Sequence, residues 1–342
     1  MVPDDFANSN ISPNAIGRTL RQNPSSVLDQ YRSLTDDVAL VDRSTVCRLR
    51  IEGSDAVDLL DRLSTNDLSS LSPGSGTSTV LTTNKGRVID LMRIVHAGDH
   101  LLAFISQPAR HRVMEWIEFY TFDEDVVISD ITDSTFMVGV AGPKAYPAVV
   151  RQFADEVAAC LPRYGLAEAR VDEVPATVFR SDFLGRSEFD FIVALTEGPA
   201  LAGILESRAG YAYPAALEPL RIERGIPAFG SELNEDRNPL EAGLVESISF
   251  NKGCYVGQEV VARLNTYDKV QRRLAILAWQ DGTVAPGDEV FASSEQVGIV
   301  TSVSAHPRDG SVGLAYVKRA FSGDEVVLGS SRATAVLGSA PP

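Results

Sequence analysis

One segment of the chain combines the residue types that make a reactive cysteine. Lys252 and Gly253 come directly before Cys254, and Gly257 opens a run with helical character three residues later. A cationic neighbour and the N-terminus of a helix both favour the thiolate, which is the nucleophilic and metal-binding form of cysteine. The residues alone leave two roles open for Cys254, namely a reactive thiol or a packed side chain.

The cysteines and histidines elsewhere predict neither a disulfide framework nor a metal site. The chain has three cysteines, Cys47, Cys160 and Cys254, too few and too far apart for a disulfide scaffold or a zinc ribbon. Cys47 lies on an apolar strand face and Cys160 in a helical run, so both are expected to pack. The four histidines show no H-E-x-x-H spacing. We therefore expect no bound metal and a reducing cytoplasm.

Asp90 is a second candidate for chemistry. Val88, Asp90, Met92 and Ile94 alternate along a β-rich run, so they are expected to share one face of a strand. A carboxylate in such an apolar row is costly to bury without a partner. Asp90 therefore needs a partner or a ligand.

The composition narrows the class of protein. The 342 residues carry a formal net charge of -15, and only five of them are lysine. This pattern is typical of a halophilic protein, kept soluble in concentrated salt, although an ordinary acidic cytosolic enzyme is the alternative. No basic stripe for nucleic acid is present. The sequence also has no apolar run of the roughly 20 residues that span a bilayer. Its first residues lack the basic start and apolar core of a signal peptide, so none is expected.

The elements that must position these residues follow from periodicity. Residues 1–26 are polar and predict a loose arm, and residues 27–250 predict an α+β body with antiparallel strands. Two hairpins are expected within it, one from 77 to 95 with its turn at 84–86 and one from 176 to 195 with its turn near 184–186. Helices are expected near 56–63, 113–120, 141–161 and 199–208. Residues 251–270 hold the cysteine motif, and the short strands of 271–342 predict a small β-barrel.

The run from Lys252 to Arg263 resembles the signature K-G-C-Y-x-G-Q-E of the folate-binding YgfZ family, whose eukaryotic relatives act in mitochondrial iron–sulfur protein maturation. The wider chain is similar to the parent superfamily, the aminomethyltransferase or T protein of the glycine cleavage system. Four further segments carry this likeness in the family's order: 48–56, 139–145, 220–227 and 239–244. The resemblance implies a three-domain cloverleaf around a central channel that holds tetrahydrofolate.

The resemblance also implies how the pterin is held. A carboxylate from the hairpin of the second domain binds it in the family, and Asp190 stands where the family has Glu. A carboxylate can accept two parallel N–H bonds from the aminopyrimidinone edge. Tyr255 and Phe250 are expected to line the pterin face or to pack, and Lys252 is assigned with them to cofactor binding.

The resemblance to the transferases also suggests roles for Asp90 and Arg221. Residues 86–91 resemble G-G-x-x-D-D-L, with Asp90 at the first aspartate and Leu91 in place of the second. The resemblance implies that Asp90 assists methylene transfer or only orients the pterin. Arg221 is expected to bind the glutamate tail of folate or to pair with Asp190, and its alternative is a structural ion pair with Glu223.

These expectations combine into a functional hypothesis and two alternatives. The resemblance implies a cytoplasmic tetrahydrofolate-binding protein of the YgfZ type that supports assembly or repair of iron–sulfur client proteins, with Cys254 as the essential thiol. One cysteine cannot hold a cluster alone, so a partner must share it. The first alternative is an aminomethyltransferase that moves a one-carbon unit from a lipoyl-bound amine to tetrahydrofolate. The second is a folate-dependent demethylase of a small methylated compound.

Overall fold

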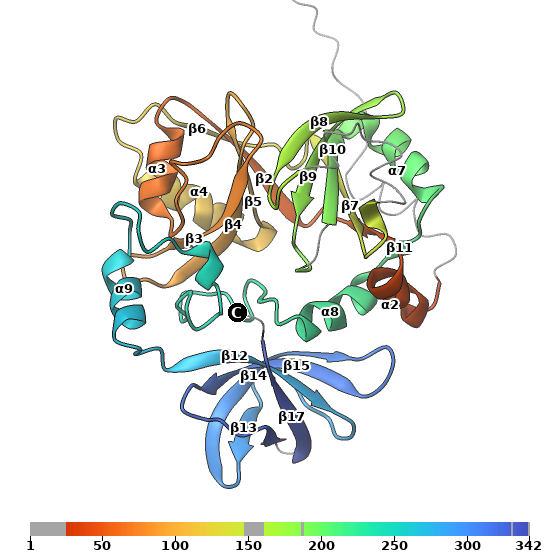
Figure 1. Ribbon diagram of the computed structural model, residues 1–342, viewed down its shortest axis with the longest axis vertical. Coiled ribbons are helices and arrows are strands. Elements are labelled where there is room, and N and C mark those ends of the chain that lie inside the picture. The colour runs from red at the N-terminus through yellow and green to blue at the C-terminus, as the bar shows by residue number, and fades with distance from the viewer. Residues whose placement is uncertain (1–24, 147–160, 186–187, 330, 341–342) are drawn as a thin grey trace, which may run out of the picture.

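The computed structural model describes residues 25–146, 161–185, 188–329 and 331–340. Two β-sheets lie next to each other, and a closed β-barrel lies beyond them (Figure 1). Most of the predicted arm at 1–26 and most of the predicted helix at 141–161 lie outside the described residues.

The first sheet has the strand order β3-β4-β5-β2-β6. Its strands are β2 (Val46–Glu52), β3 (Gly76–Thr82), β4 (Val88–His96), β5 (Leu101–Ser106) and β6 (Val127–Asp130). The predicted first hairpin is confirmed, because β3 pairs with β4 around a turn in which Gly86 has a φ of 64°. A β-bulge on β4 inserts one residue, however, so Val88 packs with Leu91 while Met92 and Ile94 join another cluster. The expectation that Val88 shares their face is wrong.

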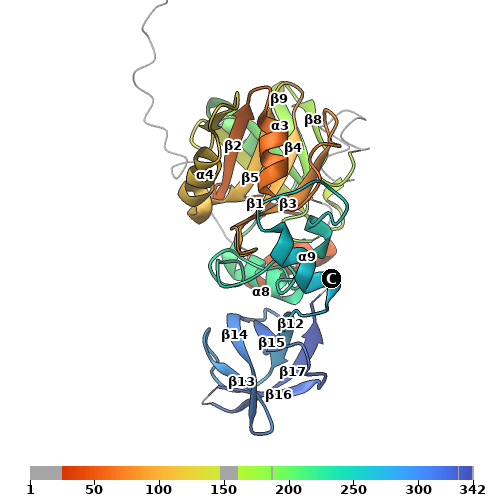
Figure 2. The same ribbon diagram turned by 90° about the vertical axis from the view of Figure 1, so that its left-hand side faces the viewer.

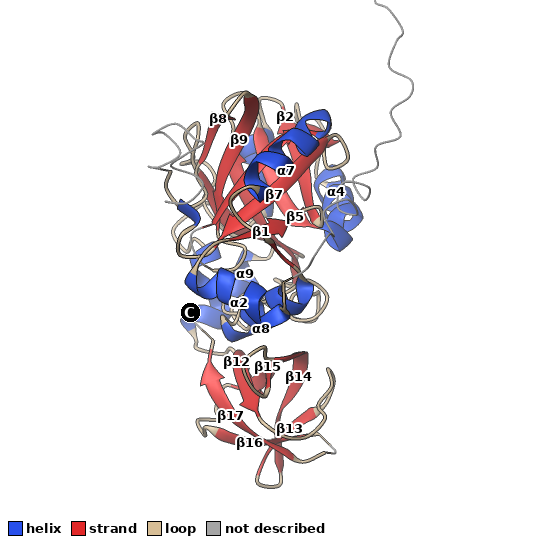
Figure 3. Ribbon diagram, turned by 90° about the vertical axis from the view of Figure 1, so that its right-hand side faces the viewer, coloured by secondary structure: helices blue, strands red, loops and turns tan. Residues whose placement is uncertain are grey.

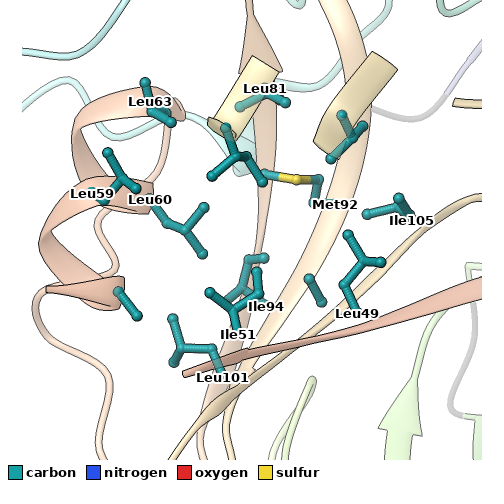
Figure 4. Close-up of a cluster of buried hydrophobic side chains, with 14 of the residues drawn as sticks. Leu49, Ile51, Leu59, Leu60, Leu63, Leu81, Met92, Ile94, Leu101 and Ile105 are labelled. Atoms are coloured by element: carbon teal, nitrogen blue, oxygen red, sulfur yellow. The ribbon is translucent and has the colours of Figure 1, made fainter. Parts of the chain in front are cut away.

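Helices cover the outer face of this sheet. They are α3 (Ala56–Leu63) and α4 (Arg110–Phe119), the latter preceded by the short helix η1 (Gln107–Ala109). In α3 the buried residues follow the i, i+3, i+4, i+7 spacing of an amphipathic helix, namely Ala56, Leu59, Leu60 and Leu63. Figure 4 shows these leucines against the side chains of β2, β4 and β5. Each fully buried leucine contributes about 2 kcal/mol by transfer from water.

The second sheet has the strand order β11-β1-β7-β10-β9-β8. Its strands are β1 (Ala39–Asp42), β7 (Thr135–Ala141), β8 (Leu166–Val171), β9 (Val174–Ser181), β10 (Glu188–Ala194) and β11 (Tyr211–Ala212). The predicted second hairpin is confirmed as β9 and β10. After η3 (Leu195–Glu197), helix α7 (Gly198–Glu206) covers the outer face of the sheet (Figure 3).

The inner faces of the two sheets pack against each other. Phe104 of β5 stacks on Phe179 of β9, with ring centroids 4.4 Å apart. Ile192 of β10 belongs to the same buried cluster. Because side chains alternate along a strand, Asp190 points to the same side of β10 as Ile192, toward the first sheet. The interface between the sheets thus holds polar groups as well as apolar ones.

The C-terminal strands close into a barrel with the order β12-β15-β14-β13-β16-β17. Its strands are β12 (Arg272–Trp279), β13 (Glu289–Ala292), β14 (Glu295–Ala305), β15 (Ser311–Lys318), β16 (Glu325–Leu328) and β17 (Ala333–Ser339). Helices α2 (Val27–Asp36), α8 (Pro214–Glu223) and α9 (Gln258–Thr266) lie between the sheets and the barrel (Figures 1 and 2). The predicted α+β cloverleaf with antiparallel sheets and a C-terminal β-barrel is confirmed. None of the described helices has the length and apolar character to cross a membrane.

Candidate functional site

A cavity of about 330 Å³ lies where the two sheets meet the segment that follows α8. Strand β4 contributes Leu91 and Arg93 to its wall, the second sheet contributes Arg163 and Asp182 from its loops, and the chain after α8 contributes Arg224. Its volume falls within the range of about 300 to 1,000 Å³ that small-molecule sites occupy. The cavity is therefore large enough for a compact organic ligand.

Arg93 brings unused hydrogen-bond donors to this cavity. Its guanidinium carbon lies 4.5 Å from the centroid of the Phe183 ring, and its buried Nε has no hydrogen-bond partner among the described residues. Burial lowers the pKa of Arg93 below its ordinary value. A buried donor without a partner is costly, so a ligand that accepts a hydrogen bond here would be favoured.

Carboxylates lie at the same cavity. Arg163 bridges two of them: its Nε lies 2.6 Å from Oδ2 of Asp182, and its Nη1 lies 2.7 Å from Oε2 of Glu246. Burial raises the pKa of Asp182, although the charge of Arg163 opposes the shift. The wall therefore offers both donors and acceptors to a polar ligand.

Asp90 lies behind this wall. It is fully buried, its Oδ2 accepts a hydrogen bond of 2.8 Å from the backbone N–H of Ser106, and its Oδ1 has no partner among the described residues. Burial raises the pKa of Asp90 to about 6. Because side chains alternate on β4, Leu91 and Arg93 line the cavity whereas Asp90 does not.

Asp190 is engaged by an arginine at the interface between the sheets. Its Oδ1 accepts a hydrogen bond of 3.0 Å from Nε of Arg43, which also pairs with Glu188. Burial raises the pKa of Glu188 to about 7 despite this pairing. Arg43 also lies over the ring of Phe183, 4.9 Å from its centroid. Arg93, which lines the cavity, lies over the same ring, so Asp190 is connected to the cavity through Arg43, Phe183 and Arg93. The Oδ2 of Asp190 is buried without a partner in the described chain.

Arg221 lies at the contact between α8 and the barrel. It forms ion pairs with Glu218 at 2.6 Å and Glu232 at 3.2 Å, and its Nη2 donates to Oγ of Ser302 at 2.9 Å. The expected ion pairs with Asp190 or Glu223 are wrong. Arg221 and Glu223 are two residues apart on α8, so their side chains do not face each other. Glu223 pairs instead with His306, at 2.8 Å.

Lys252 anchors the cysteine motif to the end of α3. Its Nζ donates to the backbone carbonyls of Asp61 at 2.6 Å, Ser64 at 3.1 Å and Asn66 at 2.6 Å, and it pairs with the Asp61 carboxylate at 2.8 Å. Burial lowers the pKa of Lys252, while the hydrogen bond with Asp61 opposes the shift. An ammonium group has three N–H donors, so none is left for a ligand or for the thiol of Cys254.

The remaining motif residues pack against the first sheet and α3. Tyr255 is buried, and the ammonium of Lys252 lies 5.6 Å from its ring centroid. Gly257 has a φ of 87°, and a Cβ there would lie 2.5 Å from the carbonyl oxygen of Thr83. Only glycine fits such a close approach. Cys254, in contrast, is an exposed free thiol.

The predicted site residues therefore do not converge on one point. Lys252, Cys254 and Tyr255 lie in one segment whose thiol alone is exposed. Asp90 lies on the helix-covered side of β4, and Asp190 lies at the interface between the sheets. None of these residues lines the cavity. Cys47 is buried as expected. No group of three or more His, Cys, Asp or Glu side chains in the described chain could hold a metal ion.

Sequence reasoning missed Arg93, Arg163 and Asp182, which do line the cavity. One signal was present, since Arg93 follows Leu91 by two residues and so faces away from Met92 and Ile94. Asp182 lies within the predicted hairpin of residues 176–195, but its pairing with Arg163 brings together two different loops. Nothing local in the sequence indicates that pairing.

Comparison with known proteins shows the family. The model of the GCVT N-terminal domain matches residues 1–252. A chloroplastic protein of Arabidopsis thaliana, described as a provisional transferase, is 33% identical over 315 residues, which are 90% of this chain and 71% of that protein. The aminomethyltransferase of Thermotoga maritima is 28% identical over 316 residues, 88% of this chain and 84% of the relative.

A solved structure shows the same fold. The glycine cleavage system aminomethyltransferase T from Bartonella henselae superposes with a TM-score of 0.79 at 21% identity, covering 93% of this chain and 89% of that one. The fold and the sequence relatives are thus consistent with one another. The chain belongs to the GCVT N-terminal domain family, within the aminomethyltransferase superfamily.

Proposed function

We propose that this protein binds tetrahydrofolate, or a related reduced pterin, in the cavity beside Leu91, and that it uses the thiol of Cys254 to support assembly or repair of iron–sulfur enzymes. The observation that carries the proposal is the guanidinium of Arg93, which lines the cavity with its buried Nε unmatched among the described residues. A ligand with a carbonyl or carboxylate oxygen satisfies that donor.

The cavity fits the chemistry of a pterin ring. The aminopyrimidinone edge presents N–H donors next to a carbonyl acceptor, so a carboxylate and a guanidinium together can read it. Asp182 supplies a largely buried carboxylate and Arg93 supplies the donors. The direct role expected for Asp190 stays a prediction, and we propose that it holds Arg43 in place behind Phe183.

The thiol supplies the second part of the proposal. Within the motif, Lys252 and Tyr255 are buried and Gly257 is fixed by its close backbone contact, which leaves Cys254 exposed on an anchored segment. An accessible thiol on a fixed backbone suits contact with a client protein. One thiol does not complete the ligand set of a cluster, so the client provides the other ligands.

Aminomethyl transfer is the second candidate function. It is favoured by the likeness of this chain to proteins named aminomethyltransferase over 88% of its length. Carboxylate assistance in that reaction requires a proton acceptor at the cavity wall. On β4, Leu91 has none and Asp90 is not among the lining residues, and the carboxylates that do line the cavity, Asp182 and Glu246, are both paired with Arg163. The transfer reaction would also leave the exposed thiol without a role.

Ligand binding is tested by titrating the protein with 5-formyl-tetrahydrofolate in a calorimeter. We expect Arg93→Met to weaken binding about tenfold or more, the size of a lost charge-assisted hydrogen bond. Arg170→Met is the control, because Arg170 is an exposed residue that pairs with Glu173. Equal affinity for wild type and Arg93→Met would contradict the assignment of the cavity.

The two functions separate in activity assays. Purified protein is tested for lipoyl-dependent formation of methylene-tetrahydrofolate, and robust turnover that survives Cys254→Ala would exclude the iron–sulfur proposal. In a bacterial strain that lacks its own protein of this type, we expect wild type, but not Cys254→Ala, to restore iron–sulfur enzyme activity. Complementation by Cys254→Ala would overturn the role of the thiol.

A further inference from the structure

A second hollow, of about 180 Å³, lies on the outer face of the barrel. The charged side chains that line it are Arg237, Arg272 and Lys318, and no Asp or Glu is among its described lining residues. The chain as a whole carries a net charge of -15 and has only five lysines. Three cations around one hollow are therefore contrary to the general charge pattern of this protein.

Arg272 and Lys318 repel each other because they lie directly opposite on neighbouring strands. Arg272 of β12 and Lys318 of β15 are direct partners in the antiparallel register, so their side chains leave the same face. Like charges directly opposite each other are destabilising. Lys318 lies 2.6 Å from Glu295, but both side chains are more than half exposed, and such pairs contribute little. Arg272 has no ion pair within the described chain. The repulsion is thus largely uncompensated.

Arg237 is held by an aromatic ring instead of an acid. Its guanidinium carbon lies 4.3 Å from the centroid of the Tyr316 ring, and the Tyr316 hydroxyl donates to the carbonyl of Glu232 at 2.9 Å, which fixes the ring. The buried Nε of Arg237 has no hydrogen-bond partner among the described residues. Stacking leaves the in-plane N–H donors free to bind an acceptor.

We propose that Arg237, Arg272 and Lys318 form a binding site for the phosphate group of a small molecule. A phosphate carries up to two negative charges, and its tetrahedral oxygens accept hydrogen bonds from several directions, whereas a carboxylate offers two oxygens in one plane. Arg272 and Lys318 belong to the barrel strands β12 and β15, and Arg237 belongs to the segment between α8 and α9. This site is separate from the cavity beside Leu91, and it does not depend on folate binding.

The test is calorimetric titration of the full chain with pyrophosphate and with inorganic phosphate at low salt. The variant is Arg272→Gln with Lys318→Gln, since both side chains are exposed and the fold should tolerate the change. The matched control is Lys144→Gln with Arg170→Gln, which removes the same two charges from exposed ion pairs elsewhere. We expect the site variant to bind about tenfold or more weakly, and the control to bind like wild type.

Thermal unfolding supplies an independent readout. Without ligand, the site variant should melt at or above the wild-type temperature at low salt, because the repulsion between Arg272 and Lys318 is removed. Pyrophosphate should raise the melting temperature of wild type and of the control, but not that of the site variant. Absence of binding to wild type, equal weakening in the control, or acetate binding as tight as phosphate would each overturn the proposal.

Discussion

Replacement of Lys252 by methionine tests whether this residue anchors the cysteine motif or activates its thiol. Methionine keeps most of the length of the side chain but removes the ammonium. In the structure only 2% of the Lys252 side chain is exposed, and its Nζ donates to three backbone carbonyls near the end of α3. The substitution leaves those carbonyls without their side-chain donor and the Asp61 carboxylate with only the backbone N–H of Leu68, at 2.7 Å.

The expected loss follows from this burial. Removal of one partner from a buried ion pair costs about 3 to 5 kcal/mol, because the remaining charge stays desolvated. Asp61 is only 16% exposed, so solvent compensates it poorly. By comparison, the ion pair of Lys144 with Asp37 is more than half exposed on both sides, and its loss in Lys144→Met should cost less than about 1 kcal/mol.

The assay is urea unfolding of wild type, Lys252→Met and Lys144→Met, together with the rate at which Cys254 reacts with an aromatic disulfide in a Cys160→Ser background. We expect a large fall in stability for Lys252→Met and an unchanged or faster thiol reaction as the segment loosens. A loss of stability below about 1 kcal/mol together with a tenfold slower thiol reaction would refute the anchoring role, because it would show that the ammonium acts on the thiolate.

Three further predictions follow from the described side chains and the composition. Burial holds the pKa of Asp90 at about 6 instead of 3.8, so its neutral form stabilises the fold at low pH and this contribution is lost as the pH rises through 6. Relative to wild type, Asp90→Asn should therefore gain about 2 kcal/mol in unfolding free energy between pH 4 and pH 7, and a difference independent of pH would contradict this. Gly257→Ala should cost about 2 kcal/mol or more by urea unfolding, whereas Gly253→Ala, whose Cβ would meet nothing within 4 Å, should be nearly neutral. If the acidic composition reflects a halophilic protein, the melting temperature should rise steeply from low salt to about 1 M potassium chloride, and a flat response favours the ordinary cytosolic alternative.

Much of the architecture could be predicted because its signals are local. In α3 the leucines recur at helical spacing, and in β3 and β4 apolar residues flank a turn that contains Gly86. The short strands after residue 270 also follow a local pattern, since each is bounded by turn residues. These patterns depend on the period of the backbone and need no knowledge of distant contacts.

The candidate site was less predictable because its chemistry depends on distant pairs. The β-bulge on β4 and the alternation of its side chains decide that Leu91 and Arg93 face the cavity while Asp90 is buried behind it. Asp90 and Leu91 differ by one residue in the sequence, but that difference reverses the face. The pairing of Asp190 with Arg43 spans 147 residues, and no local pattern indicates it.

The cysteine motif depends both on local sequence and on contacts between distant residues. The sequence by itself determined that residues 252–259 form an unusual segment around one thiol, because residue types and spacing are properties of the chain alone. Only the tertiary structure decided what each member does. The partners of Lys252 lie up to 191 residues away, and they convert an apparent activating cation into an anchor that leaves Cys254 exposed. A charge takes its role from the groups that solvate it in the fold, and those groups are brought together by packing rather than by sequence order.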